Sequence, residues 1–152
     1  MAFAFDEKEL EEQIEQLPIT SRAAFAAACA ERMAPSYQAY SARTGTGDPT
    51  IYRELLRRLW TDLAGQPMSA TEIDRNIERS EELFPEEPDP WMPEYPAAED
   101  AAAALAYSLA CRRNGSSKEA VWAARRAYEA LDDYVITREN IDTNAPEPNL
   151  KY

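Results

Sequence analysis

Residues 48–65 read DPTIYRELLRRLWTDLAG and contain every signal of an amphipathic helix. Asp48 is a favourable N-cap, and Pro49 suits the first helical position because its missing N–H would have no helical partner there. Gly65 is a favourable residue at the end of a helix. Between these signals, apolar side chains recur at helical spacing and form one wide stripe, made of Ile51, Tyr52, Leu55, Leu56, Leu59, Trp60 and Leu63. Of all the helices predicted for this chain, this one is the most strongly indicated by the sequence.

The same signals predict five further helices, over about residues 6–17, 21–45, 69–85, 96–113 and 116–140. Asp6 and Ser21 are the predicted caps of the first two, and Ser69 with Glu72 forms a capping box. Pro35 lies inside the second helix and should kink it, because proline removes one backbone hydrogen bond. Only four glycines occur, and no segment has the alternation typical of strands. The fold class is therefore predicted to be all-α.

Residues 85–96 contain five prolines, a density that forbids helix and favours a stiff, extended connection. This is a loop rather than a domain boundary, because neither flank is long enough to fold alone. The chain is thus predicted to be a single bacterial-type domain, residues 1–152: a compact bundle of about six helices with an acidic, proline-rich loop. The tail, residues 142–152, has little apolar content and is expected to be poorly ordered or draped over the bundle.

The charge of the chain is strongly negative and unevenly distributed. Its 152 residues include 28 acidic and 16 basic side chains and no histidine, which gives a net charge of −12. Residues 1–17 hold six acidic residues and one lysine, and residues 72–100 hold eleven acidic residues and two arginines. This distribution argues against general affinity for nucleic acid or anionic membranes and favours basic partners.

The residue types also limit the chemistry. Without histidine, serine triads, cysteine–histidine pairs, histidine zinc sites and the histidine ligands of di-iron bundles are excluded. Cys29 and Cys111 stand in separate apolar stretches, so they are interpreted as buried side chains in a reducing compartment rather than a redox or zinc pair. No cofactor is predicted. No window of about 18 apolar residues and no basic leader occurs, so a cytoplasmic location without membrane contact is predicted.

The candidate binding site is the acidic surface that continues into the proline-rich loop. Trp91 stands in this loop among carboxylates. Its side chain either packs against the bundle and anchors the loop there, or contacts a partner. Some of these carboxylates are interpreted as a solvated face, with a divalent cation site or a paired general acid and base as the weaker alternative. The carboxylates concerned are Glu78, Glu81 and Glu82 at helical spacing, and Glu99 and Asp100 across the loop. The predicted partner-binding residues are Glu78, Glu81, Glu82, Glu86, Glu87, Asp89, Trp91, Glu94, Tyr95, Glu99 and Asp100.

Two blocks of the sequence resemble a known family. The first is CAERMAPSY at 29–37 with TGTGDPTIY at 44–52 and Trp60, and the second is EELFP at 81–85 with YPAAEDA at 95–101. Their order and spacing resemble the YjaG-like family, number 416 among the domains of unknown function, over about residues 20–139. The resemblance implies a compact helical bundle, brings no established activity, and leads us to expect that one further amphipathic helix is missing here. Arg32 of the first block is predicted to pair with an acidic residue of the fourth or fifth helix.

The leading hypothesis is a non-enzymatic protein-binding module whose acidic face, residues 72–100, docks a basic protein. Its concrete version is an immunity or antitoxin protein, because a small acidic domain suits rapid neutralisation of a basic toxin and needs no chemistry of its own. The alternative is a structural or regulatory homo-oligomer that pairs the apolar surface left by the missing helix. A carboxylate–metal enzyme ranks third. Salt separates the first two, since screening weakens steered binding and spares apolar association.

Overall fold

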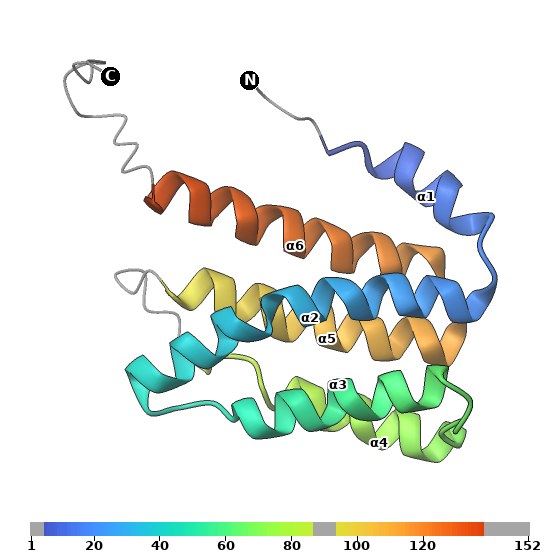
Figure 1. The fold of residues 1–152 in the computed structure, drawn as a ribbon, viewed down its shortest axis with the longest axis horizontal. Coiled ribbons are helices and arrows are strands. Elements are labelled where there is room, and N and C mark those ends of the chain that lie inside the picture. The colour runs from blue at the N-terminus through green and yellow to red at the C-terminus, as the bar shows by residue number, and fades with distance from the viewer. Residues whose placement is uncertain (1–4, 87–93, 139–152) are drawn as a thin grey trace.

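Six α-helices make up the part of the chain that the structure describes, and no strand occurs in that part (Figure 1). The structure, a computed structural model, describes residues 5–86 and 94–138, with side chains up to residue 131. The helices are α1 (Glu7–Glu15), α2 (Ile19–Thr44), α3 (Pro49–Leu63), α4 (Ala70–Glu81), α5 (Glu94–Asn114) and α6 (Ser117–Arg138). The predicted all-α fold of six helices is confirmed. Three predicted site residues, Glu87, Asp89 and Trp91, and the tail at 142–152 lie outside the described residues.

Side-chain caps begin three of the helices, as the sequence predicts. Asp6, Asp48 and Ser69 each accept a hydrogen bond from the backbone N–H three residues later, at 3.0 to 3.1 Å. These bonds satisfy amide groups that the first helical turn leaves without a partner. The residues next to the starts of α1, α3 and α4 therefore determine where these helices begin.

Two helices begin earlier than predicted. α2 begins at Ile19 rather than after Ser21, because Pro18 is extended and its carbonyl already accepts the backbone N–H of Ser21 at 2.9 Å. α5 begins at Glu94, so that Pro96 lies within its first turn. Proline is tolerated there, since the first-turn amides have no helical partner. A proline near a helix start thus predicts the start only to within a turn.

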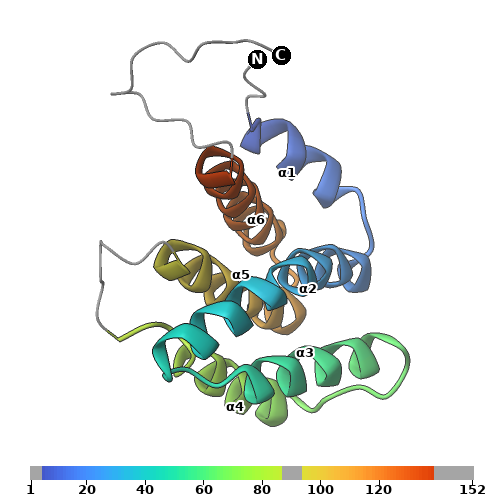
Figure 2. The same ribbon diagram turned by 60° about the vertical axis from the view of Figure 1, so that its left-hand side comes forward.

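The helices form three layers (Figures 1 and 2). α2 and α5 lie side by side in the middle, α3 and α4 cover one side, α6 covers the other, and α1 packs on α6. α2 contains Pro35, and its C-terminal part runs at an angle to its N-terminal part, as predicted. Small side chains allow α2 and α5 to approach closely. The fully buried alanines of these two helices are Ala23, Ala26, Ala27, Ala30, Ala98, Ala101, Ala102 and Ala104.

Two buried tyrosines connect the middle layer to α3 and to the segment that follows α4. The rings of Tyr37 and Tyr52 are stacked, with centroids 5.1 Å apart. The Tyr37 hydroxyl donates to the carbonyl of Leu83 at 2.8 Å and accepts the backbone N–H of Asp48 at 3.2 Å. The Tyr52 hydroxyl donates to the carbonyl of Ala30 at 2.8 Å. The turn before α3 and the end of α4 are therefore both held against α2 by one phenol group.

Candidate functional site

Four of the predicted site residues form an exposed acidic cluster at the end of α4. Glu78 and Glu81 lie in the last turns of the helix, Glu82 is its C-cap residue, and Glu86 follows in the connection to α5. All four are exposed, and none forms an ion pair with any residue that the structure describes. We call these four residues the acidic rim. Their charge is not used to hold the described fold together.

The acidic residues at the start of α5 pair with arginines, and one of them, Asp100, is buried rather than part of the solvated face that we predicted. Glu94 pairs with Arg43 of α2 at 3.0 Å. Asp100 is only 5% exposed and accepts a hydrogen bond from Arg126 of α6 at 2.9 Å. The same guanidinium lies 3.7 Å from Glu99. The packing of α5 between α2 and α6 supplies these arginines, so the three acidic residues stabilise contacts within the bundle.

A pocket of about 460 Å³ lies beside the acidic rim, where the C-terminal end of α2 meets the turn before α3 and the ends of α4 and α5. Two rim residues, Glu82 and Glu86, line it together with the predicted site residue Tyr95. The other lining residues are Tyr40, Thr44, Thr46, Gly47, Leu83, Phe84 and Pro85. The described lining thus contains two carboxylates and no basic side chain. We call it the rim pocket.

Hydroxyl groups and one glycine hold the wall of the rim pocket formed by the turn before α3. The Thr44 hydroxyl donates to the carbonyl of Tyr40 at 2.9 Å, and the Thr46 hydroxyl donates to the phenol oxygen of Tyr40 at 3.2 Å. Gly47 has a φ of +81°, and a Cβ at this position would stand 2.9 Å from the Tyr37 hydroxyl. Glycine is required here both for its backbone conformation and for this close approach. The turn that joins α2 and α3 therefore also forms a wall of the rim pocket, held in place by these contacts.

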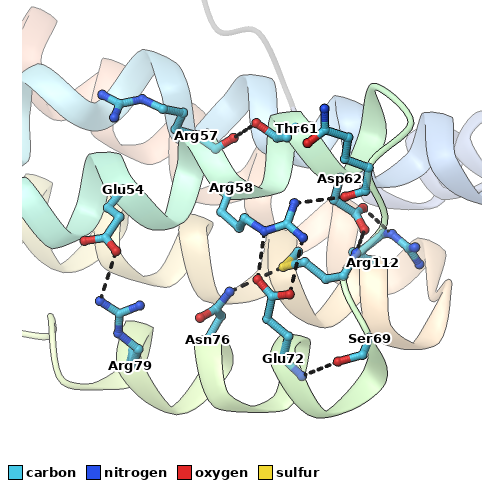
Figure 3. Close-up of polar contacts among 12 residues, drawn as sticks. Glu54, Arg57, Arg58, Thr61, Asp62, Ser69, Glu72, Asn76, Arg79 and Arg112 are labelled. Carbon is cyan, nitrogen blue, oxygen red and sulfur yellow. Dashed lines mark hydrogen bonds and ion pairs between the residues drawn. The ribbon is translucent and has the colours of Figure 1, made fainter.

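A second concentration of charge lies between α3, α4 and α5, outside the predicted site residues (Figure 3). The carboxylate of Asp62 is fully buried, accepts the backbone N–H of Met68 at 2.6 Å and pairs with the guanidinium of Arg112. Arg58 reaches both carboxylate oxygens of Glu72, at 2.7 and 3.3 Å. We call Arg58, Asp62, Glu72 and Arg112 the inner polar network. Every charge in it has a partner of opposite sign within the bundle.

The position of Asp62 in the sequence indicates that its carboxylate takes part in a buried ion pair. Asp62 stands three residues after Leu59 and seven after Leu55, on the apolar stripe of α3. A carboxylate on a buried stripe needs a cationic partner, because desolvation strongly penalises an isolated charge. The partner, Arg112, lies 50 positions later. The pattern therefore indicates that a partner is needed without indicating which arginine supplies it.

The ion pair predicted for Arg32 is not formed. Arg32 is exposed on the solvent side of α2, while its neighbour Met33 is buried. No acidic residue within the described ranges pairs with it. The arginines that do reach the acidic residues of α4 and α5 come from α2, α3, α5 and α6 at positions that face those helices.

The described residues offer little reactive chemistry. Burial raises the pKa of Cys29 and of Cys111 to about 11, so both thiols stay protonated at neutral pH and are poor nucleophiles. Within the described ranges, no group of three carboxylates or thiols lies close enough together to bind a metal ion. None of the described helices combines the length and apolar character needed to cross a membrane.

Known proteins share both the sequence pattern and the fold of this chain. The uncharacterized proteins YjaG of Escherichia coli strain K12 and of Salmonella typhimurium strain LT2 are each 32% identical over 108 residues, which cover 70% of this chain and 54% of theirs. The chain therefore spans about half the length of these relatives. A crystal structure of a DUF416 family protein from Shewanella baltica OS155 has a TM-score of 0.73 and 24% identity, over 90% of this chain and 69% of that one.

The family profile described as "Protein of unknown function (DUF416)" matches residues 9–151, almost the whole sequence. The resemblance carried by the two sequence blocks is thereby confirmed, and the solved relative has the same helical fold. The chain belongs to the DUF416 family of proteins of unknown function.

Proposed function

We propose that this protein is a non-enzymatic binding module whose acidic rim docks a basic protein. In its concrete form it is an immunity or antitoxin protein that neutralises a basic toxin domain. Such a role requires a fast and specific encounter and no catalytic group. It suits a chain that has no histidine and whose two thiols are buried.

The observation that carries this proposal is the division of the predicted acidic surface into paired and unpaired charges. Glu94, Glu99 and Asp100 pair with arginines of the bundle. The acidic rim has no such partner among the described residues, although arginines are available on α3 and α4. Four exposed carboxylates that do not stabilise the fold are available to an incoming cation.

The expected physical effect of the acidic rim is on the rate of association. Carboxylates clustered on one surface create a negative potential that attracts a basic protein from a distance and orients it. The attraction weakens as ionic strength rises, because salt screens charges beyond about 10 Å at 0.1 M. A partner that binds through the rim should therefore associate more slowly in high salt.

An oligo-arginine peptide tests this proposal as a model basic partner. Binding of the full chain to the immobilised peptide is measured across salt concentrations for the wild type and for the double variant Glu78→Lys, Glu81→Lys. The reversal should lower the association rate by about tenfold at low salt and flatten its salt dependence.

The matched control is Glu9→Lys, Glu12→Lys on α1, where both side chains are exposed. It changes the net charge by the same amount on another surface. Equal slowing by the two double variants would mean that the peptide responds only to net charge, and it would overturn the proposal.

The alternative, a homo-oligomer, is favoured by apolar side chains that the described bundle leaves exposed. Ile19 is 53% exposed at the corner between α1 and α2, and Leu131 is 60% exposed near the end of α6. If these residues pair two copies, sedimentation velocity should detect a dimer that persists in high salt and dissociates in the Ile19→Ser, Leu131→Ser variant. A monomer at every protein concentration would remove this alternative.

A further inference from the structure

The rim pocket is formed by segments that are distant in sequence and fixed relative to one another. The Tyr37 hydroxyl bonds to the backbone N–H of Asp48 on one wall and to the carbonyl of Leu83 on another. The backbone N–H of Thr46 donates to the hydroxyl oxygen of Thr44 at 3.1 Å, which stabilises the turn between them. A site whose walls are already ordered avoids the entropic cost of ordering them on binding.

The size of the rim pocket suits a side chain or a small ligand. Its volume of about 460 Å³ lies within the range of small-ligand sites, roughly 300–1,000 Å³. It opens beside the acidic rim and shares Glu82 and Glu86 with it. A group drawn to the rim therefore arrives at the mouth of this pocket.

The lining combines carboxylate groups with aromatic rings. Glu82 and Glu86 supply carboxylates, and Tyr40, Phe84 and Tyr95 supply aromatic rings. A guanidinium group can bind a carboxylate through two parallel hydrogen bonds while its plane stacks on an aromatic ring. An ammonium group is more strongly hydrated and acts as a point charge, so it uses such a lining less well. Anionic ligands are repelled by the carboxylates, and the described lining has no basic residue to offset this.

We propose that the rim pocket binds the guanidinium group of an arginine side chain of the basic partner. This inference rests on the proposed function: the acidic rim attracts the partner, and the pocket then retains one of its arginines. The two parts act on different rates. Charges of the rim outside the pocket act on association, and the pocket acts on dissociation.

Two small probes separate arginine recognition from general attraction to charge. N-acetyl-arginine amide and N-acetyl-citrulline amide have nearly the same shape, but citrulline is neutral. Each is titrated into the isotope-labelled full chain while the backbone amide signals of Thr46 and Gly47, in the pocket wall, are followed by nuclear magnetic resonance. The arginine amide should shift both signals to saturation, and the citrulline amide should bind at least about tenfold more weakly.

Variants locate the binding within the rim. Glu82→Gln with Glu86→Gln, and separately Tyr95→Leu, should each weaken binding of the arginine amide by about tenfold. Glu78→Gln with Glu81→Gln is the matched control, because both residues belong to the rim but neither lines the pocket. This control should leave the affinity for the small probe unchanged. Circular dichroism checks that every variant keeps its thermal midpoint.

The outcomes distinguish this inference from the proposed function. Equal binding of arginine and citrulline amides, or equal loss in the pocket and control variants, would overturn the pocket assignment. If the arginine amide leaves Thr46 and Gly47 unmoved while reversal of Glu78 and Glu81 still slows the oligo-arginine peptide, the proposed function stands and the pocket inference fails. If neither probe responds to its variants, both fail.

Discussion

The acidic rim and the inner polar network both contain carboxylates, but in opposite arrangements. In the network, Asp62 and Glu72 each have an arginine within hydrogen-bond distance, and the Asp62 side chain is completely buried. In the rim, all four carboxylates are exposed and have no ion-pair partner in the described part of the chain. The first arrangement stabilises the contact between helices, and the second leaves charge facing solvent.

This difference shows that the net charge of −12 does not describe the surface that a partner meets. Acidic residues at the start of α5 belong to the same acidic segment as the rim, but arginines of α2 and α6 neutralise them. Paired buried charges are costly to disturb, because removal of one partner leaves the other desolvated. Exposed unpaired charges can be changed with little effect on folding. Substitutions in the two regions should therefore differ in their effect on stability.

The largest effect is expected from Asp62→Ala in the inner polar network. The substitution removes a buried carboxylate that binds Arg112 and the N–H of Met68, so the free energy of unfolding should fall by about 3 kcal/mol. Urea denaturation measures this change. Asp74→Ala is the control, since Asp74 pairs with Arg113 on the exposed surface, and it should cost no more than about 0.5 kcal/mol. Equal losses in the two variants would contradict the distinction between buried and exposed pairs.

The next effect concerns the scaffold of the rim pocket. Gly45 and Gly47 both have positive φ, but a Cβ at Gly45 meets open space, whereas one at Gly47 meets the Tyr37 hydroxyl. Gly45→Ala should cost about 1 kcal/mol for backbone strain alone, and Gly47→Ala about 2 kcal/mol or more because the buried hydroxyl must also move. Urea denaturation of both variants measures the difference. If they lose the same stability, the Tyr37 contact does not hold this wall.

The smallest effects come from neutralising one carboxylate of the inner polar network or two carboxylates of the acidic rim. Glu72→Gln weakens the contact with both nitrogens of Arg58, so the urea midpoint should fall slightly. Glu78→Gln with Glu81→Gln should leave the midpoint unchanged or raise it, because neutralisation relieves repulsion between neighbours on one helix. A clear loss of stability in the double variant would mean that the rim carboxylates have structural partners after all.

Much of the fold can be predicted from the sequence, because its signals act over a few residues. Asp48 bonds to an amide three positions away, and the stripe from Ile51 to Leu63 repeats along a single helix. The candidate site is only partly predictable. Glu82, Glu86 and Tyr95 line one pocket, whereas Glu78 and Glu81 lie on the preceding turn of α4 outside its lining. Glu94, Glu99 and Asp100 belong to the same acidic pattern and behave differently.

The sequence by itself determined that the chain is helical, where most helices begin, and that negative charge concentrates between residues 72 and 100. Only the tertiary structure decided which of these charges are free. Asp100 meets Arg126 across 26 positions, and Asp62 meets Arg112 across 50. Such pairs form because packed helices bring distant side chains together, and no spacing within one helix encodes them. Local hydrogen bonds fix the helices, whereas the packing of the three layers decides which carboxylates remain for a partner.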